Sequence, residues 1–120
     1  MALNQRYTNA LHISIPVPEG VKSGDPVQVG SINGVAQIDR EADGTATVWL
    51  DGSWLIEVDG ATTVGAPVYI TTDGTLSADE ADGTPWGIAL ANKTATAAPV
   101  EVVPLGYTSP APASAPAGDN

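Results

Sequence analysis

The sequence contains no cysteine and a single histidine, His12. The missing thiols exclude disulfides, thiolate metal sites and cysteine nucleophiles. One imidazole per chain also excludes a metal site built from several histidines of the same chain. The chain therefore cannot be an enzyme that depends on thiols or on a cluster of histidines.

Basic residues are scarce, since four Lys and Arg stand against fourteen Asp and Glu and give a formal net charge of -10. The four are scattered along the chain: Arg6, Lys22, Arg40 and Lys93. Binding to nucleic-acid phosphates or to anionic lipid depends on clustered positive charge. We therefore expect neither nucleic acid nor a membrane as a partner.

Long apolar runs are missing as well. No segment approaches the roughly 20 residues that a membrane-spanning helix needs, and residues 1–6 lack the apolar core of a signal peptide. The sequence also has no Gly-rich phosphate loop followed by a helix. We therefore expect a soluble protein that is made in the cytoplasm.

Chain-breaking and β-branched residues are abundant instead. Thirteen Gly and ten Pro leave little room for helices, and the many Val and Ile side chains favour strands. Asp-Gly or Asn-Gly pairs, which are strong signals for tight turns, separate the apolar segments. Their first residues are Asn33, Asp43, Asp51, Asp59, Asp73 and Asp82. These features predict an all-β fold.

Alternation of apolar and polar residues predicts about eight short strands. They cover residues 12–17, 27–29, 35–38, 45–50, 53–59, 68–70, 86–90 and 100–103. This number and spacing are typical of a small β-barrel or a β-sandwich. The Asp51-Gly52 pair predicts a hairpin between the fourth and fifth strands. Ser77 and Glu80 fit a capping box, so a short helical turn is expected to begin at Ser77.

The two ends differ from this core, so we divide the chain into an N-terminal arm (residues 1–10), a β domain (residues 11–107) and a tail (residues 108–120). The tail is rich in Pro, Ala and Ser without a large apolar side chain, and is predicted to be disordered. Leu3, Tyr7 and Leu11 have helical spacing, but an extended arm fits at least as well. Ordering ten residues costs on the order of 10–20 kcal/mol, so we expect the arm to order on a partner.

Two pairs of short segments hint at internal repetition. Residues 24–27 (Gly-Asp-Pro-Val) return as residues 65–68 (Gly-Ala-Pro-Val), and residues 41–45 return as residues 80–84. Two similar β units would explain both pairs. Asp-Gly turns also recur by chance in β proteins, so the sequence leaves duplication open.

Candidate sites for chemistry are weak. Residues 39–44 imitate the first half of a calcium loop, but position twelve is Leu50 where a bidentate Glu is needed. We interpret this segment, and the acidic residues 79–82, as solvated turns. His12 and Ser14 share a strand face, yet no nucleophile elbow surrounds Ser14 and no third group orients the imidazole. We expect no catalytic residue, no metal and no cofactor.

The aromatic set is skewed, with three Trp, three Tyr and no Phe. Such side chains have an apolar body and a polar edge, which suits surfaces that become half-buried on contact. Trp54 and Trp86 are predicted to fill the core. Trp49 alternates with Val48 and Leu50, so it is predicted to point outward and to contact a subunit or partner.

Four stretches together resemble the small capsid decoration, or cement, proteins of tailed bacteriophages, whose members often carry an older label as predicted phage recombinases. The stretches are residues 21–30 (VKSGDPVQVG), 32–36 (INGVA), 64–69 (VGAPVY) and 86–89 (WGIA). The resemblance runs from about Leu11 to Leu105. The recombinase label fits poorly, because the chain has few basic residues and no phosphate loop.

The resemblance implies a β-barrel-like or sandwich-like protein, commonly a homotrimer, on the outer surface of an icosahedral phage head. It implies binding at three-fold and quasi-three-fold sites between major capsid protein subunits, and stabilisation of the shell. It carries over no catalytic residues. The protein would be made in the cytoplasm of the bacterial host and located in the virion.

Combining the resemblance with the residues, we predict a capsid or subunit interface formed by the arm and one exposed aromatic. Its members are Leu3, Asn4, Arg6, Tyr7, Leu11 and Trp49. The alternative function is a virion-displayed module that binds carbohydrate or a host surface, with Trp49 or Tyr69 as a stacking platform.

Overall fold

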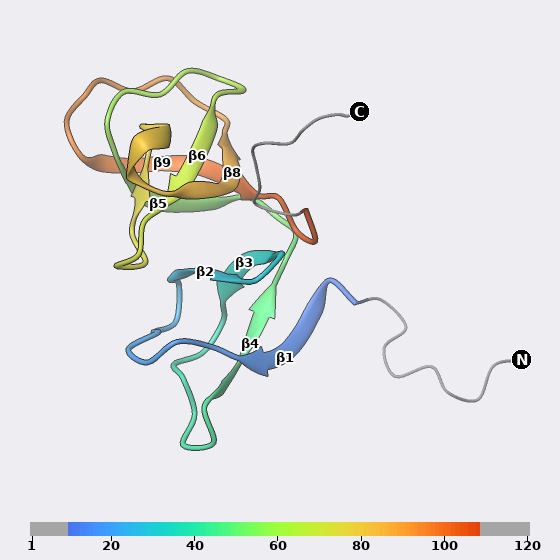
Figure 1. The fold of residues 1–120 in the computed structure, drawn as a ribbon. Coiled ribbons are helices and arrows are strands. Elements are labelled where there is room, and N and C mark those ends of the chain that lie inside the picture. The colour runs from blue at the N-terminus through green and yellow to red at the C-terminus, as the bar shows by residue number, and fades with distance from the viewer. Residues whose placement is uncertain (1–9, 109–120) are drawn as a thin grey trace, which may run out of the picture.

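The computed structural model describes residues 10–108, which form nine strands and one short 3-10 helix. The all-β prediction is therefore confirmed (Figure 1). The elements are β1 (His12–Pro16), β2 (Pro26–Val29), β3 (Ile32–Ala36), β4 (Thr45–Trp49), β5 (Trp54–Asp59), β6 (Pro67–Ile70), β7 (Leu76–Ser77), η1 (Glu80–Asp82), β8 (Thr84–Ala89) and β9 (Ala98–Pro104).

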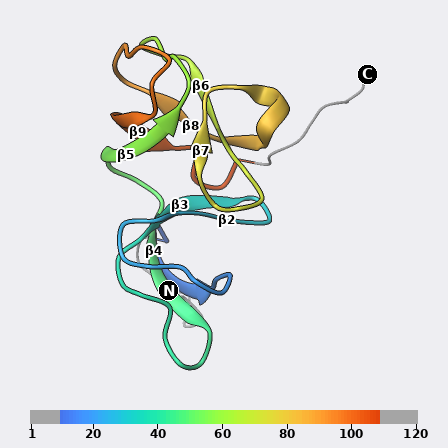
Figure 2. The same ribbon diagram turned by 90° about the vertical axis from the view of Figure 1, so that its left-hand side faces the viewer.

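The strands form two bodies. The first four make an open sheet in the order β1-β4-β3-β2, and the last five close into a barrel in the order β5-β7-β6-β8-β9. The barrel lies above the sheet in Figures 1 and 2. The predicted number of eight strands missed β7, because two residues are too few to display an alternating pattern.

The predicted hairpin between residues 45–50 and 53–59 is wrong. β4 pairs with β1 and β3, whereas β5 pairs with β7 and β9. Both edges of β4 are thus paired with strands that precede it in the sequence, so β5 has no free edge of β4 to pair with. Gly52 does adopt a positive φ of 84°, which glycine tolerates without steric cost. The turn carries the chain from the sheet to the barrel instead of returning it along β4.

The predicted helical turn exists but begins elsewhere. Its N-cap is Asp79, whose side chain accepts a hydrogen bond from the Ala81 amide at 2.9 Å. Ser77 lies in β7, and its hydroxyl donates to Asp82 Oδ2 at 2.7 Å. The Ser77 hydroxyl therefore holds the far end of η1 rather than capping its start.

The two bodies repeat one strand pattern, which starts from the Gly-x-Pro-Val segments. Pro26 and Val27 of β2 stand opposite Val35 and Gly34 of β3. In the barrel, the corresponding Pro67 and Val68 of β6 stand opposite Ile88 and Gly87 of β8. In each body the glycine before this strand donates its amide to the alanine that ends the partner strand, at 2.8 Å both times (Gly24 to Ala36, Gly65 to Ala89).

The same correspondence continues across the remaining strands. Val48 of β4 faces Ala36 on one side and Ile13 on the other. In the barrel, Val102 of β9 faces Ala89 and Trp54. The order β1-β4-β3-β2 thus matches β5-β9-β8-β6, with β7 added between β5 and β6. Equal order and register in both halves indicate an internal duplication.

The second sequence pair is not part of this repeat. Thr45 begins β4, whose counterpart in the barrel is β9, whereas Thr84 begins β8, whose counterpart is β3. The similarity of residues 41–45 and 80–84 therefore joins segments that occupy different places in the two bodies.

Each body has its own apolar core. Trp86 is fully buried in the barrel, and Val48 is fully buried in the sheet body. The Trp86 indole Nε1 donates to two backbone oxygens of the sheet, Val27 O at 3.1 Å and Gly34 O at 3.3 Å. This confirms the prediction for Trp86 and shows that it ties the two bodies together. The prediction that Trp54 also fills the core is wrong, because Trp54 is only half-buried and packs against the barrel core without belonging to its buried cluster.

Candidate functional site

The predicted interface residues fall into two groups. Leu3, Asn4, Arg6 and Tyr7 lie outside the described residues. Leu11 and Trp49 lie inside them, and the structure brings these two close together. Leu11 O accepts a hydrogen bond from the Leu50 amide at 2.7 Å, one residue beyond Trp49.

Trp49 belongs to an aromatic cluster at the junction between the two bodies, here called the junction cluster (His12, Trp49 and Trp54). The face of β4 that carries Trp49 lies opposite the buried Val48, as predicted. The His12 imidazole stacks on the Trp49 ring, with ring centroids 3.9 Å apart and planes 13° apart. Trp54 meets Trp49 edge to face at 6.0 Å. Stacked and edge-to-face rings attract beyond their area burial, so the cluster stabilises the junction.

His12 has a second partner at this junction. Its Nε2 lies 2.8 Å from Asp51 Oδ1, and both side chains are about half exposed. Asp51 also contributes its carbonyl oxygen, which accepts from Trp54 Nε1 at 3.0 Å. The prediction that no further group orients the imidazole is wrong, because the Asp51 carboxylate lies within hydrogen-bond distance of Nε2. The imidazole is directed at Asp51 and Trp49.

The first and last described residues lie beside this cluster. The Tyr107 hydroxyl donates to Ala10 O, although the two residues are far apart in the sequence. The chain therefore enters and leaves the described domain at neighbouring points. Tyr107 is 51% exposed, so it presents an aromatic side chain at the point where the described chain begins.

Sequence reasoning missed two strongly exposed apolar residues on the barrel, Leu55 and Val64, which are 75% and 66% exposed. Leu55 stands opposite Glu101 across β5 and β9. Its position could have been found from the alternation in β5, where it shares the polar face with Glu57. Val64 lies in the loop before β6 and carries no such signal.

The acidic turns use their carboxylates locally. Asp39 accepts from the Ser23 amide at 2.9 Å. Hydrogen bonds from the Thr45 hydroxyl and amide lower the pKa of Asp43, because they favour its charged form. Within residues 10–108, no three His, Asp or Glu side chains are grouped closely enough to hold a metal ion. This arrangement is that of turns rather than of a calcium loop.

Two of the basic residues also serve the fold. Arg40 Nε donates to Val17 O at 3.0 Å, and Lys93 Nζ donates to Gly60 O and, at 2.8 Å, to Thr96 O. Both cations thus hold loop carbonyls in corresponding places of the two bodies.

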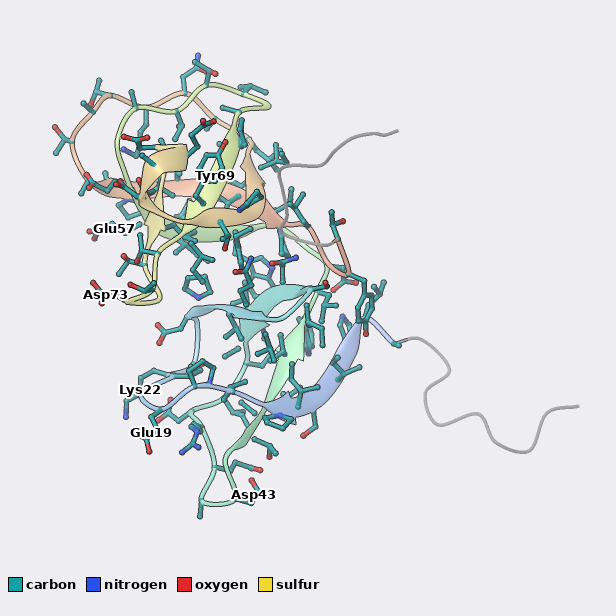
Figure 3. All side chains as sticks on the ribbon, in the orientation of Figure 1. Glu19, Lys22, Asp43, Glu57, Tyr69 and Asp73 are labelled. Atoms are coloured by element: carbon teal, nitrogen blue, oxygen red, sulfur yellow. The ribbon has the colours of Figure 1, made fainter. Side chains whose placement is uncertain are left out.

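A cleft of about 450 Å³ separates the two bodies on one side of the molecule. Its walls are the loop between β1 and β2, the edge of β2, the turn between β6 and β7, and the start of β8. Figure 3 shows Glu19 and Lys22 of the sheet body on the same side as Asp73 of the barrel. Gln28 stands at its inner end, where its side chain donates to Pro85 O at 2.8 Å.

Comparison with known proteins gives one match. A family model described as phage cement protein matches residues 6–104, which include every strand of both bodies. No curated protein and no solved structure matches the sequence. In the part of the chain that the structure describes, no helix is long and apolar enough to cross a membrane.

Proposed function

The chain belongs to the phage cement protein family, and from this premise we propose that it binds the outer surface of an icosahedral phage head and stabilises the shell. Members of the family are structural proteins of the capsid. The match over residues 6–104 is the observation that carries the proposal. The partner in this proposal is the major capsid protein, and the sites are the three-fold and quasi-three-fold positions between its subunits.

Physical features of the chain support a position outside the shell. A net charge of -10 disfavours contact with packaged DNA and keeps decorated particles apart by mutual repulsion. The closed barrel has no free strand edge of its own, which limits unwanted strand pairing between particles. These properties suit a protein that is made in the host cytoplasm and then displayed on the virion.

A homotrimer is part of the proposal. Three copies around one three-fold position would present three weak contacts together. Once one copy is docked, the other two bind at high effective concentration, so avidity can exceed a single contact by about 10²–10⁴. Weak individual contacts therefore suffice for stable decoration.

Particles that lack the protein are expected to release their DNA at a lower temperature than decorated particles. The reason is that a bound protein stabilises the state that it binds. Dye access to DNA during heating measures this, and adding back purified protein should restore the higher release temperature. Equal release temperatures with and without the protein would show that it does not stabilise the shell.

Deletion of residues 1–9 is expected to leave the domain folded and to weaken binding to undecorated heads at least tenfold. The described residues begin at Ala10, whose carbonyl oxygen still accepts from the Tyr107 hydroxyl, and the proposal assigns residues 1–9 to the contact with the shell. Co-sedimentation with heads measures binding, and the thermal midpoint reports folding. Deletion of residues 109–120 is the matched control and should leave both unchanged. Loss of folding on arm deletion would place the arm in the core instead.

The alternative role in carbohydrate or host binding gains no support from the structure. A stacking platform needs an open ring face, and one face of Trp49 carries the His12 imidazole at 3.9 Å. Tyr69 is half-buried inside β6. A glycan array probed with the full chain tests this role directly.

A further inference from the structure

The sheet body lacks the strand that closes the barrel. In the barrel, β7 stands between β5 and β6, parallel to the first and antiparallel to the second. Leu76 of β7 is 2% exposed and fills the barrel interior there. In the sheet body, β1 and β2 are the two outer strands, and no strand formed by residues 10–108 stands between them.

The internal duplication locates the missing strand. Leu76 faces Val58 of β5 and Ile70 of β6, and the residues that correspond to these two are Val17 and Val29. Several apolar side chains pack against the core of the sheet body and stay partly exposed, namely Leu11, Ile15, Val21, Val29 and Ile32. They have no counterpart of Leu76 among the described residues. The gap between the outer edges of β1 and β2, here called the opening, is the place where the barrel has β7 and the sheet body has no strand formed by residues 10–108.

The backbone at this opening offers hydrogen bonds mainly from β2. Asp25 O accepts from the Ala36 amide, so alternate residues of β2 point toward β3 and Gln28 directs its N–H and C=O outward. On β1, the Val17 amide donates to Gly44 O, which leaves Pro16 and Pro18 on the outer edge. Prolines have no N–H to donate, so they limit how far another strand can pair along this edge of β1.

The charge around the opening selects a basic occupant. The cleft between the two bodies reaches the edges of β1 and β2 that border the opening, since Pro18 and Gln28 line it. Its other lining residues include Glu19, Asp25 and Asp73, and no Lys or Arg of the described chain lines it. An extended segment with a cation and without acids complements these walls.

Residues 1–9 of this chain have that chemistry. They contain Arg6 and no acidic residue, in a chain with fourteen acids. Met1, Leu3 and Tyr7 lie at odd-numbered positions, which share one face of an extended segment, whereas Asn4 and Arg6 belong to the other face. Leu3-Asn4 also repeats the apolar-polar order of Leu76-Ser77. With Leu3 in the place of Leu76, Arg6 lies beside Glu19 and Asp25.

The occupant must come from a second copy. A strand in the place of β7 runs parallel to β1, and a parallel connection within one chain needs a dozen or more residues. Residues 1–9 lead almost directly into β1 at His12, which is too short a connection. We propose that residues 1–9 of the N-terminal arm of a second copy add to the outer edge of β2, with Leu3 between Val17 and Val29. Such a head-to-tail contact closes into a ring when the rotation permits, as in a trimer.

Cross-linking tests the contact directly, because the natural chain has no cysteine. A full-length Leu3→Cys chain is mixed with a full-length Val29→Cys chain under mild oxidation. The mixed disulfide is expected at least tenfold more often than with the matched control Leu55→Cys, whose position is far more exposed. Equal yields with both partners would overturn the proposal.

Charge reversal tests the same contact through self-association, measured by sedimentation equilibrium of the free protein. Arg6→Glu and Glu19→Arg should each weaken association at least tenfold, and the double variant should restore it. Each variant should keep the circular dichroism spectrum of the natural protein, and for Glu19→Arg this follows because Glu19 is exposed and lies outside the core clusters. A free protein that stays monomeric would overturn arm exchange, while leaving shell binding, measured separately on heads, intact.

Discussion

Replacement of Trp86 by alanine is expected to lower the free energy of unfolding by about 3–5 kcal/mol, the usual loss for a large buried aromatic. The side chain is 0% exposed at the centre of the barrel core. Small domains have only about 5–15 kcal/mol in total. Trp86→Ala should therefore remove a large share of the stability of the protein. Urea unfolding followed by circular dichroism measures the loss.

Trp86→Phe distinguishes the contribution of the buried aromatic ring from that of the indole hydrogen bonds. Phe keeps most of the apolar volume but cannot donate to Val27 O and Gly34 O. Loss of such contacts costs about 0.5–1.5 kcal/mol, so this variant should fall between the natural protein and Trp86→Ala. Because the indole joins the barrel to the sheet body, both bodies should unfold in one transition. A Trp86→Ala protein with unchanged stability would contradict the core described above.

Gly34→Ala and Gly87→Ala are each expected to lower the free energy of unfolding by roughly 3 kcal/mol, at the upper end of what overpacking costs. A Cβ at Gly34 would lie 2.6 Å from Trp49 O, and one at Gly87 would lie 2.3 Å from Val103 O. Both contacts are with backbone atoms of the neighbouring strand, which cannot rotate away. Chemical denaturation measures the two losses, which should be similar because the two glycines occupy corresponding places in the repeat.

Gly65→Ala is the control for these two variants. Nothing lies within 4 Å of a Cβ at Gly65, and only its φ of +89° opposes a side chain. That backbone conformation costs an L-residue roughly 1–2 kcal/mol, so Gly65→Ala should be the mildest of the three. If Gly34→Ala or Gly87→Ala cost no more than Gly65→Ala, the close approach of the neighbouring strands would be wrong.

The two pairs of similar segments show how much of the repeat could be predicted from the sequence. Residues 24–27 and 65–68 indicated a repeat, and the structure places them in corresponding strands with the same register. Residues 41–45 and 80–84 looked equally similar but begin strands that do not correspond. Short turn motifs report local conformation, so they can recur in places that are unrelated in the fold.

The candidate site was predictable only in part. Alternation along β4 correctly placed Trp49 on the face opposite Val48. It could not indicate that His12 and Trp54 would contact that ring. His12 reaches Trp49 through the pairing of β1 with β4, and Trp54 follows after a turn. The contacts of a surface aromatic depend on which strands pair with its own strand, and the residues near it in the sequence do not show that pairing.

The sequence by itself determined the all-β class, the positions of most strands, the absence of thiol chemistry and the resemblance to phage cement proteins. These follow from composition and from patterns within a few residues. Only the tertiary structure decided which strands pair, that the first four form an open sheet while the last five close a barrel, and that β7 makes this difference. Strand pairing joins residues far apart in the chain, and its free energy depends on the complete set of neighbours rather than on any one segment.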